Sequence, residues 1–487
     1  MFASIKRLTK HSAVYGLSLM LARSISFLLL PFHTNVFPTE AYGVVTLGFA
    51  YLAITGVFYT FGIDSAFLRY YLLDDTTFDR RGVFSTSFHS ITLISAILSM
   101  IGWFLAPALA HWQLGSAEYA YIMQLCVGIL FFDALSALPF LILRAEERSR
   151  TFAILKIANV ALNFALNYFL IIHLKRGIAG VFEANLIASI FSFLALGHLT
   201  LRHLDLRFRN SIFKELLAFG LPYIPSVLSV ILIENLSRMF LKHYTGLATV
   251  GIFNAGYKFG MIMALMVAAF RFAWQPFFLS TSKQPDAKII FSRVLTYFSL
   301  VSGVVFLGTC FFVDDLVRLN LGGFTILGKE YWQSTVIVPL ILFAEFFPGA
   351  YTIFIVGLQL KKKTIYLPVV TGIGAVANVA LNYALIPKFG MIGAAWAAVF
   401  AYVAMAASSY LISQRLYRVD YEWLRLVKLA GVVAALFAIE RIFSIPFIGR
   451  AGLLLAFPIA LFALGFFENS EIARVKKIFG LSPDFHR

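Results

Sequence analysis

The sequence predicts an all-α integral membrane protein of about fourteen transmembrane helices, arranged as two pseudo-symmetric six-helix lobes plus two extra C-terminal helices. Three observations support this prediction. Of the 487 residues, 60% are hydrophobic and only 13% are charged, whereas soluble domains carry about a quarter charged residues. Apolar stretches near the roughly 20 residues that a spanning helix needs recur along the whole chain. A segment of the first half also returns in the second half.

The apolar stretches define the predicted spans in order. The first follows a short basic N-terminus and shows no small-residue cleavage site, so we expect a retained helix rather than a signal peptide. The fourteen predicted spans cover residues 11–36, 41–63, 84–110, 117–142, 152–173, 177–200, 213–240, 249–279, 289–313, 333–358, 364–387, 391–413, 422–442 and 449–467.

The basic residues predict the orientation in the membrane. The net charge of +16 does not indicate nucleic acid binding, because the sequence has no extended basic patch with interleaved aromatic residues. Most of the 40 lysines and arginines fall instead in loops on the side of the N-terminus. By the positive-inside rule both termini are expected in the cytoplasm.

A repeated segment divides the chain into two halves. The sequence Ala-Asn-Val-Ala-Leu-Asn occurs at Ala158–Asn163 and again at Ala377–Asn382, and Tyr42–Gly43 has its counterpart in Val250–Gly251. An even number of spans separates the copies, so both halves share one orientation, as in parallel repeats suited to alternating access. We therefore predict an N-lobe over 1–211, a C-lobe over 212–415, and helices 13 and 14 with a cytoplasmic tail over 416–487.

The sequence resembles the polysaccharide-transporter branch of the MOP superfamily of flippases and multidrug exporters over roughly residues 1–415. The residues that carry the resemblance are Gly16, Arg23, Glu40-Ala41-Tyr42-Gly43, Phe219-Gly220-Leu221-Pro222, Arg238, Val250-Gly251-Ile252-Phe253, Ala255-Gly256-Tyr257-Lys258 and Phe272-Ala273-Trp274-Gln275-Pro276. The resemblance implies a V-shaped, MOP-type bundle in the bacterial inner membrane. It also implies that the protein moves an undecaprenyl-pyrophosphate-linked oligosaccharide, such as an O-antigen unit of lipopolysaccharide, to the periplasmic leaflet.

Basic residues inside the predicted spans are the first candidates for a substrate site. A charge at mid-helix costs roughly 2.5–3.5 kcal/mol on insertion scales, so it is expected to face a partner or a wet cavity. We predict that Arg23, Lys258 and Arg271 meet an anionic substrate. Glu234 and Arg238, four residues apart in the favourable order, are expected to form a structural ion pair. Lys156 is expected to reach the nearby interface by snorkelling.

Asparagines and acids within the spans are further candidates. Asn159, Asn163 and Asn167 follow one helix face, and Asn378 and Asn382 repeat this pattern in the second half. Their amides could bind sugar hydroxyls in the cavity, and interhelical hydrogen bonding explains them equally well. The candidates for coupling to a proton or sodium gradient are Asp133 and Glu345, together with Glu183; pairing of these acids with buried basic residues is the alternative.

These observations favour a transporter over an enzyme. The sequence has no phosphate-binding glycine loop with its lysine, no metal motif and no nucleophile elbow, so no cofactor is expected. The leading prediction is a flippase that carries an anionic lipid-linked oligosaccharide by alternating access, with membrane lipids and other polysaccharide-assembly proteins as partners. The alternatives are a cation-coupled multidrug exporter of the same superfamily and a membrane-embedded glycan-modifying enzyme.

Overall fold

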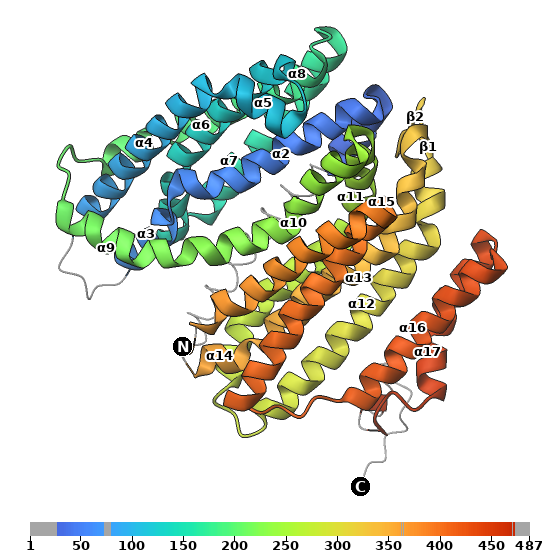
Figure 1. Cartoon of the computed structure of the whole chain (residues 1–487). Coiled ribbons are helices and arrows are strands. Elements are labelled where there is room, and N and C mark those ends of the chain that lie inside the picture. Colours follow the sequence, from blue (N-terminus) through green and yellow to red (C-terminus); the bar gives the residue numbers. More distant parts are fainter. Residues whose placement is uncertain (1–26, 73–78, 362, 364, 470, 473–487) are drawn as a thin grey trace.

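The computed structural model describes residues 27–72, 79–361, 363, 365–469 and 471–472, and these are almost entirely helical (Figure 1). The first half contains the helix Phe27–Val36, α2 (Thr39–Thr60), α3 (Ile63–Leu72), α4 (Arg80–Phe104), α5 (Ala106–Leu114), the 3₁₀ turn η1 (Ala117–Tyr119), α6 (Ala120–Ala145), α7 (Ser149–Tyr168), the π-helical turn η2 (Phe169–His173) and α8 (Gly177–His203).

The second half follows with α9 (Asn210–Gly220), η3 (Leu221–Tyr223), α10 (Ile224–Thr245), α11 (Leu247–Thr281) and α12 (Ala287–Arg318). A hairpin of two short strands, β1 (Asn320–Leu321) and β2 (Phe324–Thr325), precedes η4 (Lys329–Ile337), α13 (Val338–Phe354), α14 (Val356–Leu360), α15 (Tyr366–Leu416), α16 (Trp423–Phe443) and α17 (Phe447–Ala463).

The all-α membrane fold is confirmed. Ten of the described helices are long and apolar enough to cross a membrane, and Phe27–Val36 and α17 are shorter apolar helices. One of the ten, α15, contains two predicted spans, because Gly390 with φ 54° interrupts its helical backbone. The predicted span 213–240 is broken instead into α9, η3 and α10 around Pro222, since proline lacks the N–H that continues a helix.

The helices form two bundles that meet at one end, which is the predicted V shape (Figure 1). In the first bundle α6 packs against α4 and α8, and in the second α10 and α13 pack against α15. The seventh predicted helix joins the two, because α9 packs on α3 and α4 while α10 packs on α15. The expected lobe boundary after residue 211 thus precedes a segment that packs on the first bundle.

The bundles meet where α2 and α11 begin. A Cβ atom at Gly43 would collide with the carbonyl oxygen of Leu247, and one at Gly251 would collide with that of Thr39. Leu247 and Thr39 are the first residues of α11 and α2, so the two contacts are pseudo-symmetric. Glycine permits this close approach of two helices, which explains why the sequence repeats Tyr42–Gly43 as Val250–Gly251.

Hydrogen bonds between the first helix and the segment after α12 also hold the bundles together at the end where α2 and α11 begin. The Asn35 amide donates to the main-chain oxygen of Thr325 at 2.7 Å, and the Gly328 N–H donates to Thr34 Oγ1 at 3.1 Å. The Tyr331 hydroxyl donates to the main-chain oxygen of Phe37 at 2.8 Å. The second bundle therefore closes over the end of the first helix, at the end predicted to face the periplasm.

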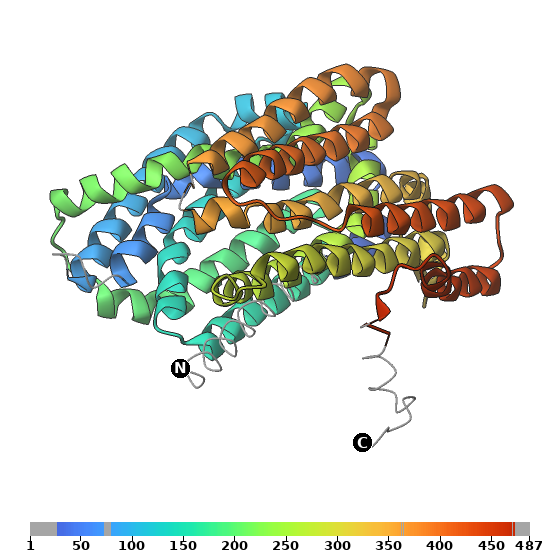
Figure 2. The ribbon, with the colours of Figure 1, turned by 90° about the horizontal axis from the view of Figure 1, so that it is seen from below.

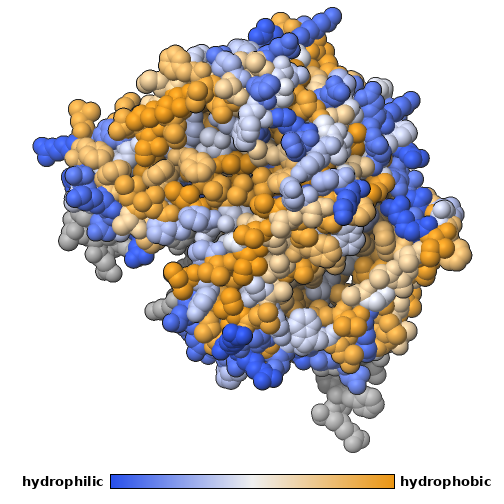
Figure 3. Space-filling view, in the orientation of Figure 1, coloured by the Kyte–Doolittle hydropathy of each residue, from blue (hydrophilic) through white to orange (hydrophobic). Residues whose placement is uncertain are grey.

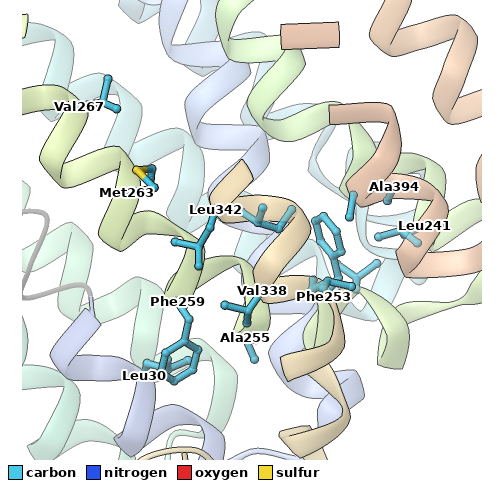
Figure 4. Packing of buried hydrophobic residues seen from close by; sticks show 14 of the residues in the cluster. Leu30, Leu241, Phe253, Ala255, Phe259, Met263, Val267, Val338, Leu342 and Ala394 are labelled. Carbon is cyan, nitrogen blue, oxygen red and sulfur yellow. The ribbon is translucent and has the colours of Figure 1, made fainter. Parts of the chain in front are cut away.

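The core between the bundles is built along α11. Phe259 of α11 lies beside Leu30 of the first helix (Figure 4). Farther along α11, Val338 and Leu342 of α13 pack against it. Phe27 and Phe259 pack edge to face with ring centroids 5.5 Å apart. This packing holds α11 against both bundles, so the polar residues of α11 have fixed positions.

At the opposite end the two bundles diverge. Figure 1 shows α3, α4 and α9 on one side and α14 on the other, and Figure 3 shows the surface indented between them. The helix ends and loops on this side carry Arg69, Arg80, Arg207, Lys214 and Lys361, and the charge distribution predicts that this side is cytoplasmic. The structure is thus closed at the predicted outer end and open toward the predicted inner end.

The C-terminal helices lie at one edge of the molecule against α12 (Figure 2). Arg425 of α16 contacts Glu422 at 3.1 Å and Glu471 at 2.9 Å. Partial burial acts to raise the pKa of the Glu471 carboxyl, but hydrogen bonds from Tyr297 and Arg425 hold that pKa below its usual value. These contacts fasten the C-terminal segment to α12.

Candidate functional site

A polar pocket of about 240 Å³ lies between the two bundles. From the first half it is lined by apolar residues and by the neutral polar side chains His33, Tyr42, Thr46, Asn163 and Asn167. From the second half it is lined by Asn235 and Arg238 of α10 and by Asn254 and Lys258 of α11. Among the described lining residues, the lysine and the arginine both come from the second half.

Arg238 is a buried cation that hydrogen-bonds to neutral groups and lies within the electrostatic reach of Glu234. Its side chain is only 8% exposed. Nε and Nη2 each lie 3.3 Å from Asn254 Oδ1, and Nη1 lies 3.1 Å from Asn235 Oδ1. The guanidinium carbon also lies 4.9 Å from the ring centroid of Tyr257. The expected ion-pair partner is Glu234, and Nη1 donates a hydrogen bond to its main-chain carbonyl. The side chain of Arg238 thus orients the amides of Asn235 and Asn254.

Lys258 lies one turn after Asn254 on α11 and faces the same pocket. Its charge acts on both Arg238 and His33. Two cations that share a pocket of low dielectric repel each other, and an anion placed between them relieves this repulsion. The predicted role of Lys258 at the substrate is therefore compatible with its position.

The first half supplies a connected set of neutral hydrogen-bonding groups. His33 Nε2 lies 3.1 Å from Asn167 Oδ1, and Asn167 Nδ2 donates to Asn163 Oδ1 at 3.0 Å. Across the pocket, Asn254 Nδ2 donates to the Tyr42 hydroxyl at 3.3 Å. Neutral amides and hydroxyls of this kind can exchange hydrogen bonds with sugar hydroxyls.

Three of the predicted asparagines do not line this pocket. Asn159 Nδ2 donates to the main-chain oxygen of Ala188 at 2.7 Å and to Ser192 Oγ at 2.8 Å, which ties α7 to α8. Asn378 and Asn382 are 0% exposed, and Asn382 Nδ2 donates to Asn378 Oδ1 at 2.8 Å. For Asn159 the structure favours interhelical hydrogen bonding, which was the alternative explanation, whereas the bond between Asn378 and Asn382 lies within α15.

The remaining predicted cations lie elsewhere. Arg271 is exposed, thirteen residues beyond Lys258 on α11, and does not line the pocket. Lys156 lies with its Nζ 4.0 Å from the ring centroid of Phe140. Arg23 falls outside the described residues. Of the basic residues predicted to meet the substrate, the structure therefore brings only Lys258 into the described pocket.

The acidic candidates fall in different surroundings. Asp133 of α6 accepts a hydrogen bond from Ser189 and lies within the electrostatic reach of Lys156. Glu345 of α13 is 8% exposed and accepts from the Tyr257 hydroxyl at 2.8 Å. Glu183 pairs with the exposed Arg176 and not with a buried basic residue. Within the described ranges, no group of three or more His, Cys, Asp or Glu side chains could hold a metal ion.

Several pocket residues were not predicted from the sequence. His33, Asn235 and Asn254 were not singled out, and Arg238 was assigned a purely structural pairing. A periodic signal was present, because Asn235 and Arg238 are three residues apart and Asn254 and Lys258 four apart. Each pair therefore lies on one face of an otherwise apolar helix.

A second, apolar groove of about 420 Å³ lies between the second bundle and the C-terminal helices. It is lined mainly by aromatic and aliphatic side chains of α12, α13, α15 and α16, among them Phe306, Phe343, Phe346, Phe347 and Tyr410. Its chemistry fits a hydrocarbon chain rather than a polar group.

Comparison with known proteins agrees with this arrangement. Residues 8–282 match the family described as polysaccharide biosynthesis protein. An Lsg locus protein of Haemophilus influenzae is 23% identical over 294 residues, which cover 56% of this chain and 67% of that protein.

Among solved structures, the lipid II flippase MurJ in an inward closed conformation has a TM-score of 0.74 at 15% identity. The match covers 92% of this chain and 98% of MurJ. A mutant of the Vibrio cholerae MATE transporter VcmN has a TM-score of 0.55 at 15% identity, covering 85% of this chain and 97% of VcmN. At these identities the similarity concerns the fold, which is that of the MurJ and MATE structures. The family match spans more than half of the present chain, and the chain therefore belongs to the polysaccharide biosynthesis protein family.

Proposed function

We propose that this protein is a flippase that moves an anionic, undecaprenyl-pyrophosphate-linked oligosaccharide from the cytoplasmic to the periplasmic leaflet of the bacterial inner membrane. The observation that carries the proposal is the pocket between the bundles, where Arg238 and Lys258 face His33 and the amides of Asn163 and Asn167. Membership of a polysaccharide biosynthesis family and a fold like that of a lipid II flippase support it.

The two walls of the pocket suit the two polar parts of such a substrate. Lysine and arginine bind phosphate oxygens through charge-assisted hydrogen bonds. Asparagine amides can bind sugar hydroxyls. Because the phosphate contacts and the sugar contacts come from different bundles, both would change when the bundles rock. In this proposal Arg23 of the first helix adds a third cation, as expected from the sequence.

The lipid part of the substrate would remain in an apolar environment. The groove beside α16 offers about 420 Å³ of space lined by phenylalanines and aliphatic residues. An isoprenoid chain of undecaprenyl length could lie in part along this groove while its remainder stays among the membrane lipids. The polar head group would then enter the pocket through the opening between the bundles.

Transport against a gradient needs an energy source, and we propose a proton or sodium gradient coupled through Asp133. This carboxylate accepts from Ser189 and faces the charge of Lys156 inside the first bundle. Glu345, which accepts from Tyr257, is the second candidate. Binding of a cation at either carboxylate would change the charge balance of its bundle.

The test is the leaflet distribution of undecaprenyl-linked glycans in cells depleted of the protein, measured with a labelling reagent restricted to the periplasm. We expect these glycans to accumulate on the cytoplasmic side, and mass spectrometry of the labelled material then identifies the glycan. Restoring wild-type protein should reverse the accumulation. An unchanged distribution together with normal surface polysaccharide would refute the flippase proposal.

The second candidate function is cation-coupled export of organic cations, which the fold similarity to the VcmN MATE transporter favours. Such an exporter is expected to use acidic residues to hold its cargo, whereas the charged residues of the described pocket lining are basic. Resistance to cationic drugs on overexpression, with no change in lipid-linked glycans, would support export.

A further inference from the structure

A chain of hydrogen bonds joins the pocket cation to the opposite bundle. Arg238 on α10 holds Asn254 on α11 through Nε and Nη2, each 3.3 Å from Asn254 Oδ1. The same asparagine donates through Nδ2 to the hydroxyl of Tyr42 on α2 at 3.3 Å. Since Arg238 fixes which side of the amide is the acceptor, it also directs the amide N–H groups toward Tyr42.

Tyr42 stands between the pocket and the closed end of the molecule. It lines the pocket and is 3% exposed. Its neighbour Gly43 packs directly on Leu247. Its ring meets that of Tyr331 edge to face with centroids 5.7 Å apart, and Tyr331 itself bonds the end of the first helix. The Asn254–Tyr42 hydrogen bond therefore helps to hold together the two bundles that separate when the outer end opens.

An anion in the pocket would compete for the same edge of Arg238. Phosphate oxygens accept two parallel hydrogen bonds from a guanidinium, and such charge-assisted bonds are shorter and roughly twice as strong as bonds to a neutral amide. The present bonds to Asn254 are long, since typical N–H···O distances are near 2.9–3.0 Å. A phosphate that takes the Nε and Nη2 edge thus removes the group that orients Asn254.

We infer that Arg238, Asn254 and Tyr42 form a substrate-sensitive latch: an anion bound at Arg238 releases Asn254 from Tyr42 and so weakens the closed outer end. The inference rests on the proposed function and adds how that site is regulated. A ligand shifts a conformational equilibrium only through different affinities for the two states. Here the difference arises because Arg238 is available to the anion only when it no longer holds Asn254.

Removing the hydrogen bond between Asn254 and Tyr42 is expected to shift the equilibrium between outer-closed and outer-open molecules. Tyr42→Phe removes the hydroxyl and keeps the ring that packs on Tyr331. Losing the net stabilisation of one hydrogen bond is expected to raise the ratio of outer-open to outer-closed molecules about 2- to 12-fold without any ligand. Asn254→Ala is expected to act in the same direction, which provides a second variant if the first one folds poorly.

The experiment measures the opening directly by spin-label distances on the full chain in lipid nanodiscs. The labels are attached at Leu174→Cys, directly after η2, and at Phe389→Cys, beside the break at Gly390 in α15; both positions are exposed and lie at the end predicted to be periplasmic. Both native cysteines are buried, which favours selective labelling. The probe is farnesyl pyrophosphate, and its binding is measured in parallel by equilibrium dialysis with labelled compound.

Tyr331→Phe is the matched control, because it also removes one tyrosine hydroxyl between the bundles but has no link to Arg238. We expect Tyr331→Phe also to start from a raised open-to-closed ratio, but the probe should still lengthen its distance, as in wild type, because the bond from Asn254 to Tyr42 is intact. In Tyr42→Phe the probe should change the distance little, because the bond that it would release is already absent. A wild-type response in Tyr42→Phe would overturn the latch and leave the flippase proposal intact, as would probe binding to wild type without a distance change. If wild type does not bind the probe, the latch and the proposed site both fail.

Discussion

The two copies of the repeated Ala-Asn-Val-Ala-Leu-Asn segment have the same sequence but different surroundings. In the first copy, Asn163 opens on the pocket between the bundles. Its counterpart Asn382 is 0% exposed and is bonded to Asn378 on its own helix. Asn163 thus lines the pocket, whereas Asn382 contributes to internal packing, as Asn159 of the first copy also does. A sequence repeat preserves the fold of each half without preserving the role of its polar residues.

The difference extends to the pocket as a whole. The first half contributes neutral groups such as His33 and Asn163, whereas α10 and α11 contribute Arg238 and Lys258. An asymmetric pocket of this kind can hold a substrate whose two polar parts differ, with phosphate toward α10 and α11 and sugar toward α7. Four predictions test this comparison.

The largest effect is expected at Lys258. Lys258→Ala removes a charge from the cationic wall, and a hydrogen bond to a charged group contributes about 1.5–3 kcal/mol, so transport is expected to fall about 10- to 150-fold. Lys258→Arg keeps the charge and should retain most activity. The measurement is recovery of normal leaflet distribution in depleted cells at matched protein levels. Full recovery by Lys258→Ala would contradict the cationic wall.

Asn382→Ala is expected to act on stability instead. It removes the donor to Asn378 Oδ1 and leaves that buried oxygen without this hydrogen bond, at a cost of about 1 to 3 kcal/mol. Thermal unfolding in detergent should show a lower midpoint, with transport per folded molecule unchanged. The double variant Asn378→Ala/Asn382→Ala should lose less than the sum of the single variants, because both partners are then removed. Additive losses would argue against the pairing.

Asn163→Ala should show the opposite behaviour to Asn382→Ala. Removing one neutral hydrogen bond to the substrate is expected to weaken binding about 2- to 12-fold. The unfolding midpoint should fall less than in Asn382→Ala, since Asn163 is half-buried and Asn167 keeps its hydrogen bond to the main-chain oxygen of residue 163. Titration with a soluble prenyl-pyrophosphate-linked sugar measures the affinity. A lower midpoint with unchanged affinity would assign Asn163 to packing, like its counterpart.

Arg271→Ala is expected to have the smallest effect. The side chain is exposed and lies away from the pocket, so transport should change less than about 2-fold, as for most surface substitutions. Initial rates in proteoliposomes measure this. A loss as large as that of Lys258→Ala would extend the cationic surface along α11 toward the open end.

The fold could be predicted from the sequence because its main determinant is local. Apolar segments of membrane-spanning length give the helices, and the repeat gives two bundles of like orientation. The packing of α9 on the first bundle was not predicted, because hydropathy does not report which neighbour a helix contacts. The lobe boundaries at residues 211 and 415 stay predictions.

The site could be predicted only in part. Lys258 and Asn163 were recognised because a polar residue in an apolar span is costly and conspicuous. The positions of Asn378 and Arg271 were not foreseen, since the orientation of a helix about its own axis depends on tertiary packing. For the same reason the contact of Asn254 with Tyr42 on the other bundle could not be read from either segment alone.

The most direct test of the central claim is photo-crosslinking with a prenyl-pyrophosphate-linked sugar that carries a photoreactive group on the sugar. The account predicts crosslinks to peptides of α2 and α7 at the pocket, displaced by unlabelled compound and lost in Lys258→Ala. Crosslinks confined to lipid-facing surfaces, or equally abundant in Lys258→Ala, would contradict binding of an anionic lipid-linked glycan between the two bundles.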